Sequence, residues 1–174
     1  MPSKALARSG ATPAGNLAEA QLHRVLGYQL AQAAIATSAV FMAAVGKPFG
    51  VRPVEYTILA LIHQNPGGSP AQLAKALAVT APNITMWIDR MEAQGWVVRR
   101  RDENDKRAQQ LRLTPRGAAL VTKATEQVLA GERKAFANLS DGERTILIEL
   151  LHKVACTRPI HPNTVRPELV EGSG

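Results

Sequence analysis

Apolar residues recur at helical spacing through most of this chain, and turn signals divide them into separate segments. The first segment is expected to start at Asn16, with Glu19 as a capping residue, and to end at Gly46 and Pro48. It is longer than a small domain can cover. Its alanine-rich middle, AQAAIATSA, favours close approach of another helix, including one from a second subunit.

Three shorter helices are predicted next. Pro53 opens the first of them, which runs to about Gln64 and buries Ile58, Leu59 and Ile62. The second starts in a capping box formed by Ser69 and Gln72, and its inner face carries Leu73 and Leu77. The third is capped by Thr80, continues to about Gln94 and stops at Gly95.

A hairpin follows these helices. Residues 96–100 and 110–114 alternate apolar and polar positions, and the segment DENDKRA joins them as a turn. Thr114 and Pro115 start a further helix, and Ser140 with Glu143 forms the capping box of the last one. We therefore predict a mainly α fold with a small β-hairpin, in which a winged helix-turn-helix lies between N-terminal and C-terminal helices.

The predicted organisation is one domain with unstructured ends. Residues 1–15 are rich in Ala, Gly, Ser and Pro, and the tail 157–174 has prolines and no periodicity, so both are expected to be disordered. The domain spans 16–156, with the winged helix-turn-helix at about 52–114 and flanking helices at about 16–46 and 115–156.

The helix from Thr80 to Gln94 has two distinct faces. At 100° per residue, Ile84, Trp87, Ile88 and Met91 fall on one side, which we assign to the core. Residues that can meet DNA lie opposite, near the amino end where a recognition helix touches base edges. Asn83 and Thr85 can hydrogen-bond to bases, and Met86 can contact a thymine methyl group.

Backbone contacts complete the predicted DNA surface. Arg90 is placed for a phosphate, and the helix start at Ser69 offers a second phosphate site. Arg107 at the hairpin tip suits a narrow minor groove, with Asp105 to orient it, and Asp89 is expected to pair with a basic residue. The candidate DNA-binding residues are Ser69, Gln72, Thr80, Pro82, Asn83, Thr85, Met86, Arg90, Lys106 and Arg107. The competing interpretation is that these are only solvated polar positions.

Composition adds weaker constraints. The net charge of +7 and a pI near 10.1 suit a polyanionic partner such as double-stranded DNA, and an aromatic content of 4% favours helices over a sandwich or barrel. A single cysteine, Cys156, excludes an intrachain disulfide and fits a cytoplasmic protein. The chain has no run of about 18 consecutive apolar residues, so no membrane span is expected. No secretion signal is evident either.

Enzymatic and metal-binding motifs are not evident. His23, His63, His152 and His161 have no metal-ligand spacing with one another or with Cys156. Phosphate-loop, nucleophile-elbow and paired-carboxylate patterns are missing as well, so we expect neither an enzyme nor a cofactor.

The segment DENDKRAQQLRLTPRG resembles the wing signature of MarR-family transcription regulators, with Asp105, Lys106, Arg107, Leu113, Thr114 and Gly117 in the family pattern. Upstream, ITMWIDRMEAQGWV is similar to the family's recognition helix. The resemblance covers about residues 17–155. It implies a homodimer made by the first and the last two helices, a pseudo-palindromic DNA site with Arg107 in the minor groove, and a repressor that releases DNA when a small, often aromatic, carboxylate binds.

The same resemblance implies an effector pocket between the dimerisation helices and the winged domain, for which His23, Tyr28, Arg52 and Tyr56 are candidates. Two features depart from the family. Met86 stands where a basic or polar residue is common, so the operator sequence cannot be inferred. Cys156 lies far from the N-terminal cysteine of the redox-sensing branch, which argues against peroxide sensing. An architectural DNA binder and a winged-helix protein-interaction module remain as alternatives.

Overall fold

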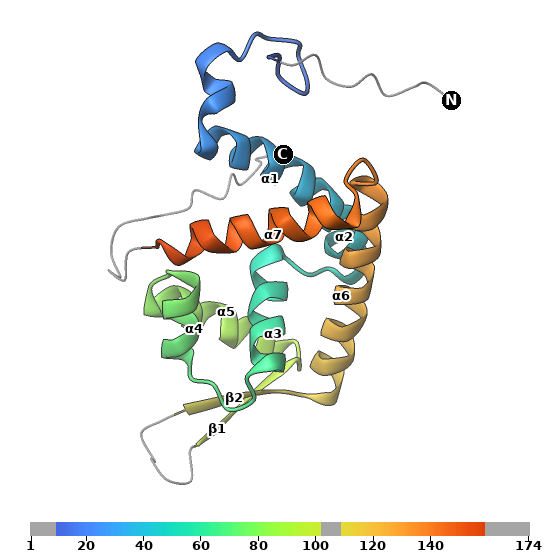
Figure 1. The fold of residues 1–174 in the computed structure, drawn as a ribbon. Helices are drawn as coiled ribbons and strands as arrows, with labels where there is room; N and C mark the ends of the chain where they lie inside the picture. Colours follow the sequence, from blue (N-terminus) through green and yellow to red (C-terminus); the bar gives the residue numbers. More distant parts are fainter. Residues whose placement is uncertain (1–9, 102–108, 159–174) are drawn as a thin grey trace.

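The computed structural model describes residues 10–101 and 109–158. Two groups of elements make up the molecule (Figure 1). The lower group holds α3 (Pro53–Gln64), α4 (Pro70–Leu77), α5 (Ala81–Ala93) and the hairpin of β1 (Val97–Arg101) and β2 (Gln109–Leu113). The upper group holds the N-terminal helices and α7 (Asp141–Cys156), and α6 (Pro115–Ala135) joins the two groups. This arrangement confirms the predicted fold class.

The core of the lower group is built from the residues that the periodicity selected. Ile58, Leu59 and Ile62 of α3 are buried, as are Ile84 and Ile88 of α5. Met91 is also fully buried, whereas Trp87 on the same face is only partly covered. The side chains of Val97 and Leu111 add the inner face of the hairpin to this core.

The hairpin is antiparallel, with Val97 opposite Leu113 and Arg99 opposite Leu111. Its second strand, β2, also forms hydrogen bonds with the loop between α3 and α4. The N–H of Gly67 donates to the carbonyl of Leu111 (2.9 Å), and the N–H of Leu111 donates to the carbonyl of Gly68 (3.0 Å). These bonds fix the entry to α4 against the hairpin.

The N-terminal helix differs from its predicted form. A 3-10 turn, η1 (Ala20–Arg24), precedes α1 (Leu26–Phe41), and the two are separated at Val25, whose ψ is 111°. Asn16 has a φ of 52° and lies outside the helix, so it is not the helix start. The carboxylate of Glu19 does not cap a helix, because it bonds instead to His23 and Tyr28.

The end of that helix was also placed too early. A π turn, η2 (Met42–Gly46), continues directly into α2 (Lys47–Phe49), and the chain leaves the helix only at Gly50, with a φ of 64°. Gly46 does not stop the helix because its φ of −55° is helical. Pro48 lies within this continuous helical run, one residue before its last residue, Phe49.

Part of the N-terminus expected to be disordered has a defined conformation. Residues 10–15 form a turn closed by an isolated bridge between Ala11 and Ala18. The hydroxyl of Thr12 holds the turn, since it donates to the carbonyl of Ala14 (2.6 Å) and accepts from the N–H of Leu17 (3.0 Å). The other residues assigned to disordered ends fall largely outside the described ranges.

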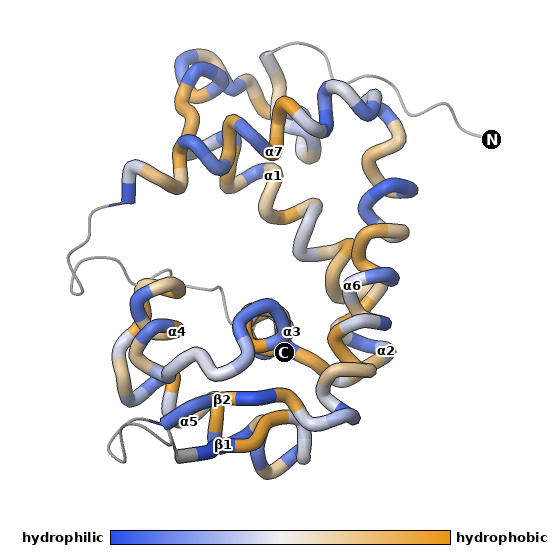
Figure 2. The backbone as a smooth tube through the Cα atoms, turned by 60° about the horizontal axis from the view of Figure 1, so that its bottom comes forward, coloured by the Kyte–Doolittle hydropathy of each residue, from blue (hydrophilic) through white to orange (hydrophobic). Residues whose placement is uncertain are grey.

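Apolar side chains remain exposed on the upper group. The helical run Leu26–Phe49 is long and apolar enough, by length and composition alone, to cross a membrane, and only 17% of its most apolar stretch is buried. This helix was not singled out in the sequence, where an unbroken apolar run was the criterion. Along α7 every residue is exposed except Arg144, which is half-buried. Figure 2 shows apolar residues along both α1 and α7.

Candidate nucleic-acid interface

The amino-terminal half of α5 presents an uncovered surface. Pro82, Asn83, Thr85 and Met86 are all exposed, and Met86 keeps 56% of its surface accessible. The hydroxyl of Thr85 donates to the carbonyl of Ala81 (2.9 Å), so toward a ligand it can act as an acceptor. A thioether and an exposed amide beside it suit a thymine methyl group and a base edge.

Thr80 occupies the N-cap position of α5 but does not cap it with its side chain. Its backbone carbonyl accepts the first helical bond, from the N–H of Ile84 (3.2 Å). Because Pro82 in the first turn has no N–H, one of the donors that a cap would satisfy is missing from the start. The Thr80 side chain is therefore exposed and makes no capping hydrogen bond to α5.

The start of α4 is a complete capping box, as predicted. The N–H of Ser69 donates to Oε1 of Gln72 (2.8 Å), and the N–H of Gln72 donates to Oγ of Ser69 (3.2 Å). Both backbone donors are therefore satisfied internally. A phosphate at this end of α4 would meet side chains and a single backbone donor, the N–H of Ala71, because Pro70 has no N–H and that of Leu73 donates to the Ser69 carbonyl.

Arg90 is oriented differently from the prediction. Its Nε lies 3.0 Å from Oε1 of Glu55, whose side chain is 2% exposed, while that of Arg90 is 48% exposed. The other carboxylate oxygen of Glu55 accepts from the N–H of Arg52 (2.9 Å). Since a buried carboxylate needs a partner, Arg90 links the recognition helix to the start of α3, and a DNA phosphate would have to share it with Glu55.

A second ion-pair cluster fastens the hairpin to α5. The guanidinium of Arg99 on β1 bonds to Glu92 (Nη1–Oε2, 2.6 Å) and to Asp89. The backbone N–H of Arg99 also donates to Glu92 Oε1 (3.3 Å). The expected pairing of Asp89 with a basic residue is confirmed. Arg99 is consequently engaged within the protein, whereas the side chains of Arg100 on β1 and Arg112 on β2 are exposed.

The hairpin tip cannot be placed in the same way. Asp105, Lys106 and Arg107 lie outside the described residues, so their predicted wing role stays a prediction.

The junction between hairpin and α6 is tightly packed. The Thr114 hydroxyl donates to the carbonyl of Gly95 (2.7 Å) and accepts from the N–H of Gly117 (3.0 Å), while the N–H of Thr114 donates to the carbonyl of Trp96 (3.0 Å). The side chain of Trp96 at this junction is buried and belongs to the core. Residues 114–117 (TPRG) thus fix the orientation of α6 relative to α5 and the hairpin.

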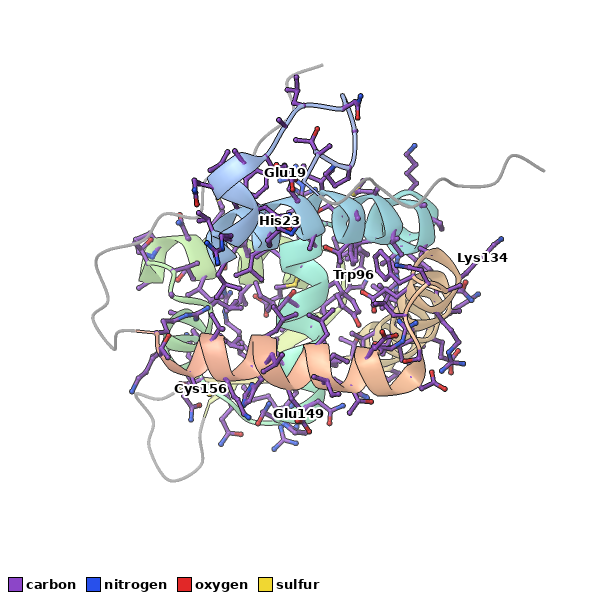
Figure 3. The ribbon with its side chains drawn as sticks, turned by 45° about the horizontal axis from the view of Figure 1, so that its top comes forward. Glu19, His23, Trp96, Lys134, Glu149 and Cys156 are labelled. Carbon is purple, nitrogen blue, oxygen red and sulfur yellow. The ribbon has the colours of Figure 1, made fainter. Side chains whose placement is uncertain are left out.

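The four candidate effector residues do not converge on one site. His23 and Tyr28 meet at the buried carboxylate of Glu19, where His23 Nδ1 is 2.8 Å and the Tyr28 hydroxyl 3.0 Å from its oxygens (Figure 3). Burial raises the pKa of the Tyr28 phenol above its ordinary value, and the hydrogen bond to Glu19 and its negative charge raise it further. The phenol therefore acts as a donor at neutral pH.

The other two candidates lie on α3. The Tyr56 hydroxyl is 3.0 Å from the Thr125 hydroxyl of α6, and its ring packs on Phe41 with 5.6 Å between centroids. The Arg52 side chain is exposed. Within the described ranges, no group of three or more His, Cys, Asp or Glu residues could hold a metal ion.

Two structural residues escaped the sequence analysis. Glu55 was not predicted to be buried, although it precedes Ile58, Leu59 and Ile62 at helical spacing and so belongs to the core face of α3. Glu19 was treated as a cap, and it is buried beside the turn at residues 10–18, which leaves no periodic signal. Local spacing could have identified the first residue but not the second.

Comparisons with known proteins agree with this geometry. The MarR family model matches residues 51–108. A putative transcriptional regulatory protein for the hcr operon of Thauera aromatica is 33% identical over 129 residues, which cover 74% of this chain and 78% of the relative.

Two solved structures similar to this chain contain DNA. The transcriptional repressor CouR bound to a 23-mer DNA duplex superposes with a TM-score of 0.74 at 28% identity, over 80% of this chain and 98% of that one. A variant of MarR from E. coli complexed with operator DNA has a TM-score of 0.67 at 26% identity, over 77% and 96% of the two chains.

Proposed function

Because this chain belongs to the MarR family of transcription regulators, we propose that it is a homodimeric repressor that binds a pseudo-palindromic operator and releases it when a small effector binds. The observation that carries this proposal is the uncovered amino-terminal face of α5, with Asn83, Thr85 and Met86 exposed beside a basic hairpin. Repression is favoured because CouR, a transcriptional repressor, has the same fold on DNA.

Dimerisation is supported by the apolar side chains that one copy of the chain leaves uncovered. On α7, Ile146 is 57% exposed and Leu150 is 52% exposed, and on α1 Ile35 is 68% exposed. A monomer rarely exposes so continuous an apolar surface. A second copy that covers it would hold two recognition helices about one DNA turn apart, which makes the operator two-fold symmetric.

DNA recognition is assigned to two kinds of contact. The exposed residues of α5 read bases in the major groove, while Lys106 and Arg107 of the wing and the start of α4 hold the backbone and minor groove. Arg90 contributes from the side of α5 that faces Glu55. In this proposal the dimer acts in the cytoplasm, as expected for a DNA-binding regulator.

Effector control is the remaining part of the proposal. A ligand that changes the spacing of the two recognition helices by favouring one conformation would alter operator occupancy about 5- to 150-fold, which corresponds to a coupling of about 1–3 kcal/mol. His23, Tyr28, Arg52 and Tyr56 stay candidates for such a site. The first two meet at Glu19 in the upper group, and Tyr56 on α3 contacts Thr125 of α6, the helix that joins the two groups.

Two substitutions distinguish the contribution of the wing to DNA binding from that of the recognition helix. We expect Arg107→Ala to weaken operator binding several-fold or more, because a minor-groove arginine is lost, and Asn83→Ala to change sequence preference instead. The measurement is fluorescence anisotropy with an operator selected from random DNA.

Arg133→Ala on the exposed surface of α6 serves as the control for loss of a positive charge. Wild-type affinity of the Arg107 variant at physiological salt would disprove the wing assignment. Loss of all sequence preference in the unmodified protein would favour an architectural DNA binder, and no salt-sensitive DNA binding would favour a protein-interaction module.

A further inference from the structure

One carboxylate of the winged domain is buried without a full set of hydrogen bonds. The side chain of Glu55, in the first turn of α3, is only 2% exposed. Its Oε2 accepts from the backbone N–H of Arg52 (2.9 Å), whereas Oε1 accepts no hydrogen bond from the described residues. The charge is balanced by the guanidinium of Arg90 on α5, whose Nε lies 3.0 Å from Oε1. Because a buried charge without a counterion is costly, Glu55 restrains Arg90.

This restraint occupies only one edge of the Arg90 guanidinium. Nε lies beside Glu55, the Arg90 side chain is 48% exposed, and no described residue accepts a hydrogen bond from its Nη groups. A guanidinium is planar and presents its donors in fixed directions, so an anchored Nε also determines where the Nη groups point. The Nη groups can therefore donate to a DNA phosphate while Nε stays with the carboxylate.

Arg90 also lies at the border of the surface assigned to DNA. It follows Asn83 by about two helical turns, and at 100° per residue both residues fall on the same side of α5. Base contacts near Asn83 set the register of the helix in the groove, so a restrained Arg90 meets the phosphate backbone at one position. An unrestrained arginine would instead reach a phosphate in any register.

We propose that Glu55 is a positioning residue for DNA recognition, which holds the Arg90 guanidinium so that its Nη groups meet a phosphate only when α5 is in register on the operator. Glu55 is buried and acts through Arg90. It lowers the affinity for DNA of arbitrary sequence more than the affinity for the operator, and thereby raises specificity. The inference rests on the proposed function, because the operator defines the correct register.

Glu55→Gln removes the restraint and keeps the start of α3, because glutamine can still accept from the N–H of Arg52. On DNA of arbitrary sequence we expect the affinity to rise about three- to fivefold. The slope of log affinity against log salt should steepen by about 0.9, the value for one added phosphate contact. Operator affinity should change less, so the preference for the operator falls. Anisotropy titrations at a series of salt concentrations measure these quantities, and an unchanged slope on arbitrary DNA would overturn the inference.

The same substitution in an Arg90→Gln background is the matched control. It removes the same negative charge, but no guanidinium is present to be released. Glu55→Gln should therefore leave the salt slope on arbitrary DNA nearly unchanged in this background. Equal steepening in both backgrounds would show that Glu55 acts only through its charge, and would overturn the inference.

Arg90→Lys tests the same idea in a protein that keeps Glu55, and so covers the case in which Glu55→Gln does not fold. A lysine ammonium is a single donor group without a fixed fork, so it cannot hold a carboxylate at one edge and a phosphate at another. Operator affinity of Arg90→Lys should fall to that of Arg90→Gln. Operator affinity equal to that of the unmodified protein would overturn the inference, because charge alone would then suffice.

Failure of the proposed function gives a different result. An unmodified protein that binds the operator no better than arbitrary DNA would overturn the proposed function, and with it the gain in specificity. The salt slopes on arbitrary DNA would still decide whether Glu55 restrains Arg90.

Discussion

At the scale of single residues, Gly117 has the least room for change. A Cβ atom built on it would lie 2.1 Å from the carbonyl oxygen of Trp96, well inside van der Waals contact. The same carbonyl accepts from the N–H of Thr114, and the Thr114 hydroxyl accepts from the N–H of Gly117 (3.0 Å). The glycine is therefore required by the close approach of α6 to the first strand.

We predict that Gly117→Ala lowers the free energy of unfolding by at least about 2 kcal/mol, because the clash is with backbone that cannot rotate away. Thermal denaturation followed by circular dichroism measures the change. Gly142→Ala is the control, since a Cβ there meets nothing within 4 Å, and it should be neutral or slightly stabilising. Equal stability of the two variants would contradict the packing described for the junction.

The charged residues of α5 show how far single positions could be predicted. Asp89 was expected to pair with a basic residue, and it pairs with Arg99. Arg90 was assigned to a phosphate, yet it lies against Glu55. Helical periodicity gives the face on which a residue lies, but the destination of a long side chain depends on which helix crosses that face, and one sequence does not contain that information.

At the scale of secondary-structure elements, the start of α7 depends on pH. The N–H of Ser140 donates to Glu143 Oε2 (2.8 Å), and this bond lowers the pKa of the Glu143 carboxyl below its ordinary value, with the Ser140 hydroxyl adding to the effect. Because the folded-state pKa is the lower one, the carboxylate stabilises the helix above the ordinary pKa of 4.5, and this contribution is lost as pH falls through the folded-state value.

We expect Glu143→Gln to be less stable than the unmodified protein at neutral pH and to approach it under acid conditions, because a glutamine keeps the capping geometry without the charge. Circular dichroism melts over a pH series give the comparison. Glu149→Gln, an exposed substitution on the same helix, is the control. A constant difference between the unmodified protein and Glu143→Gln at all pH values would exclude the charged capping box.

Capped and alternating segments were predicted well, and the long N-terminal helix was not. The capping boxes at Ser69 and Ser140 and the strand pairing are local features, so a few neighbouring residues specify them. The separation at Val25 and the π turn at 42–46 are different. The π turn lies where the helix packs on α6, with Val40 and Ala44 close to Gly131, and no local signal records this contact. The separation at Val25 has no local signal either.

At the scale of the whole molecule, α1 and α7 have apolar surfaces that a single copy does not cover (Figure 2). Length and composition alone allow the run Leu26–Phe49 to cross a membrane, but a dimer interface accounts equally for its low burial and also for the exposed apolar residues of α7. The proposed dimer accounts for both helices together.

Leu150→Glu should therefore convert the dimer to a monomer, because it places a charge in the centre of the apolar surface of α7. Analytical ultracentrifugation measures the mass, and Glu149→Gln on the same helix provides the control (Figure 3). A dimer that persists in Leu150→Glu would show that α7 is not part of the interface.

Sequence-specific binding to DNA is the central claim, and the direct test is titration of the purified protein against DNA from immediately upstream of its own gene, with excess competitor DNA and a series of salt concentrations. The account predicts a complex that survives competitor and weakens as salt rises, since phosphate contacts release counterions. A complex removed equally by any competitor, on this DNA and on sequences selected from a random pool, would contradict it.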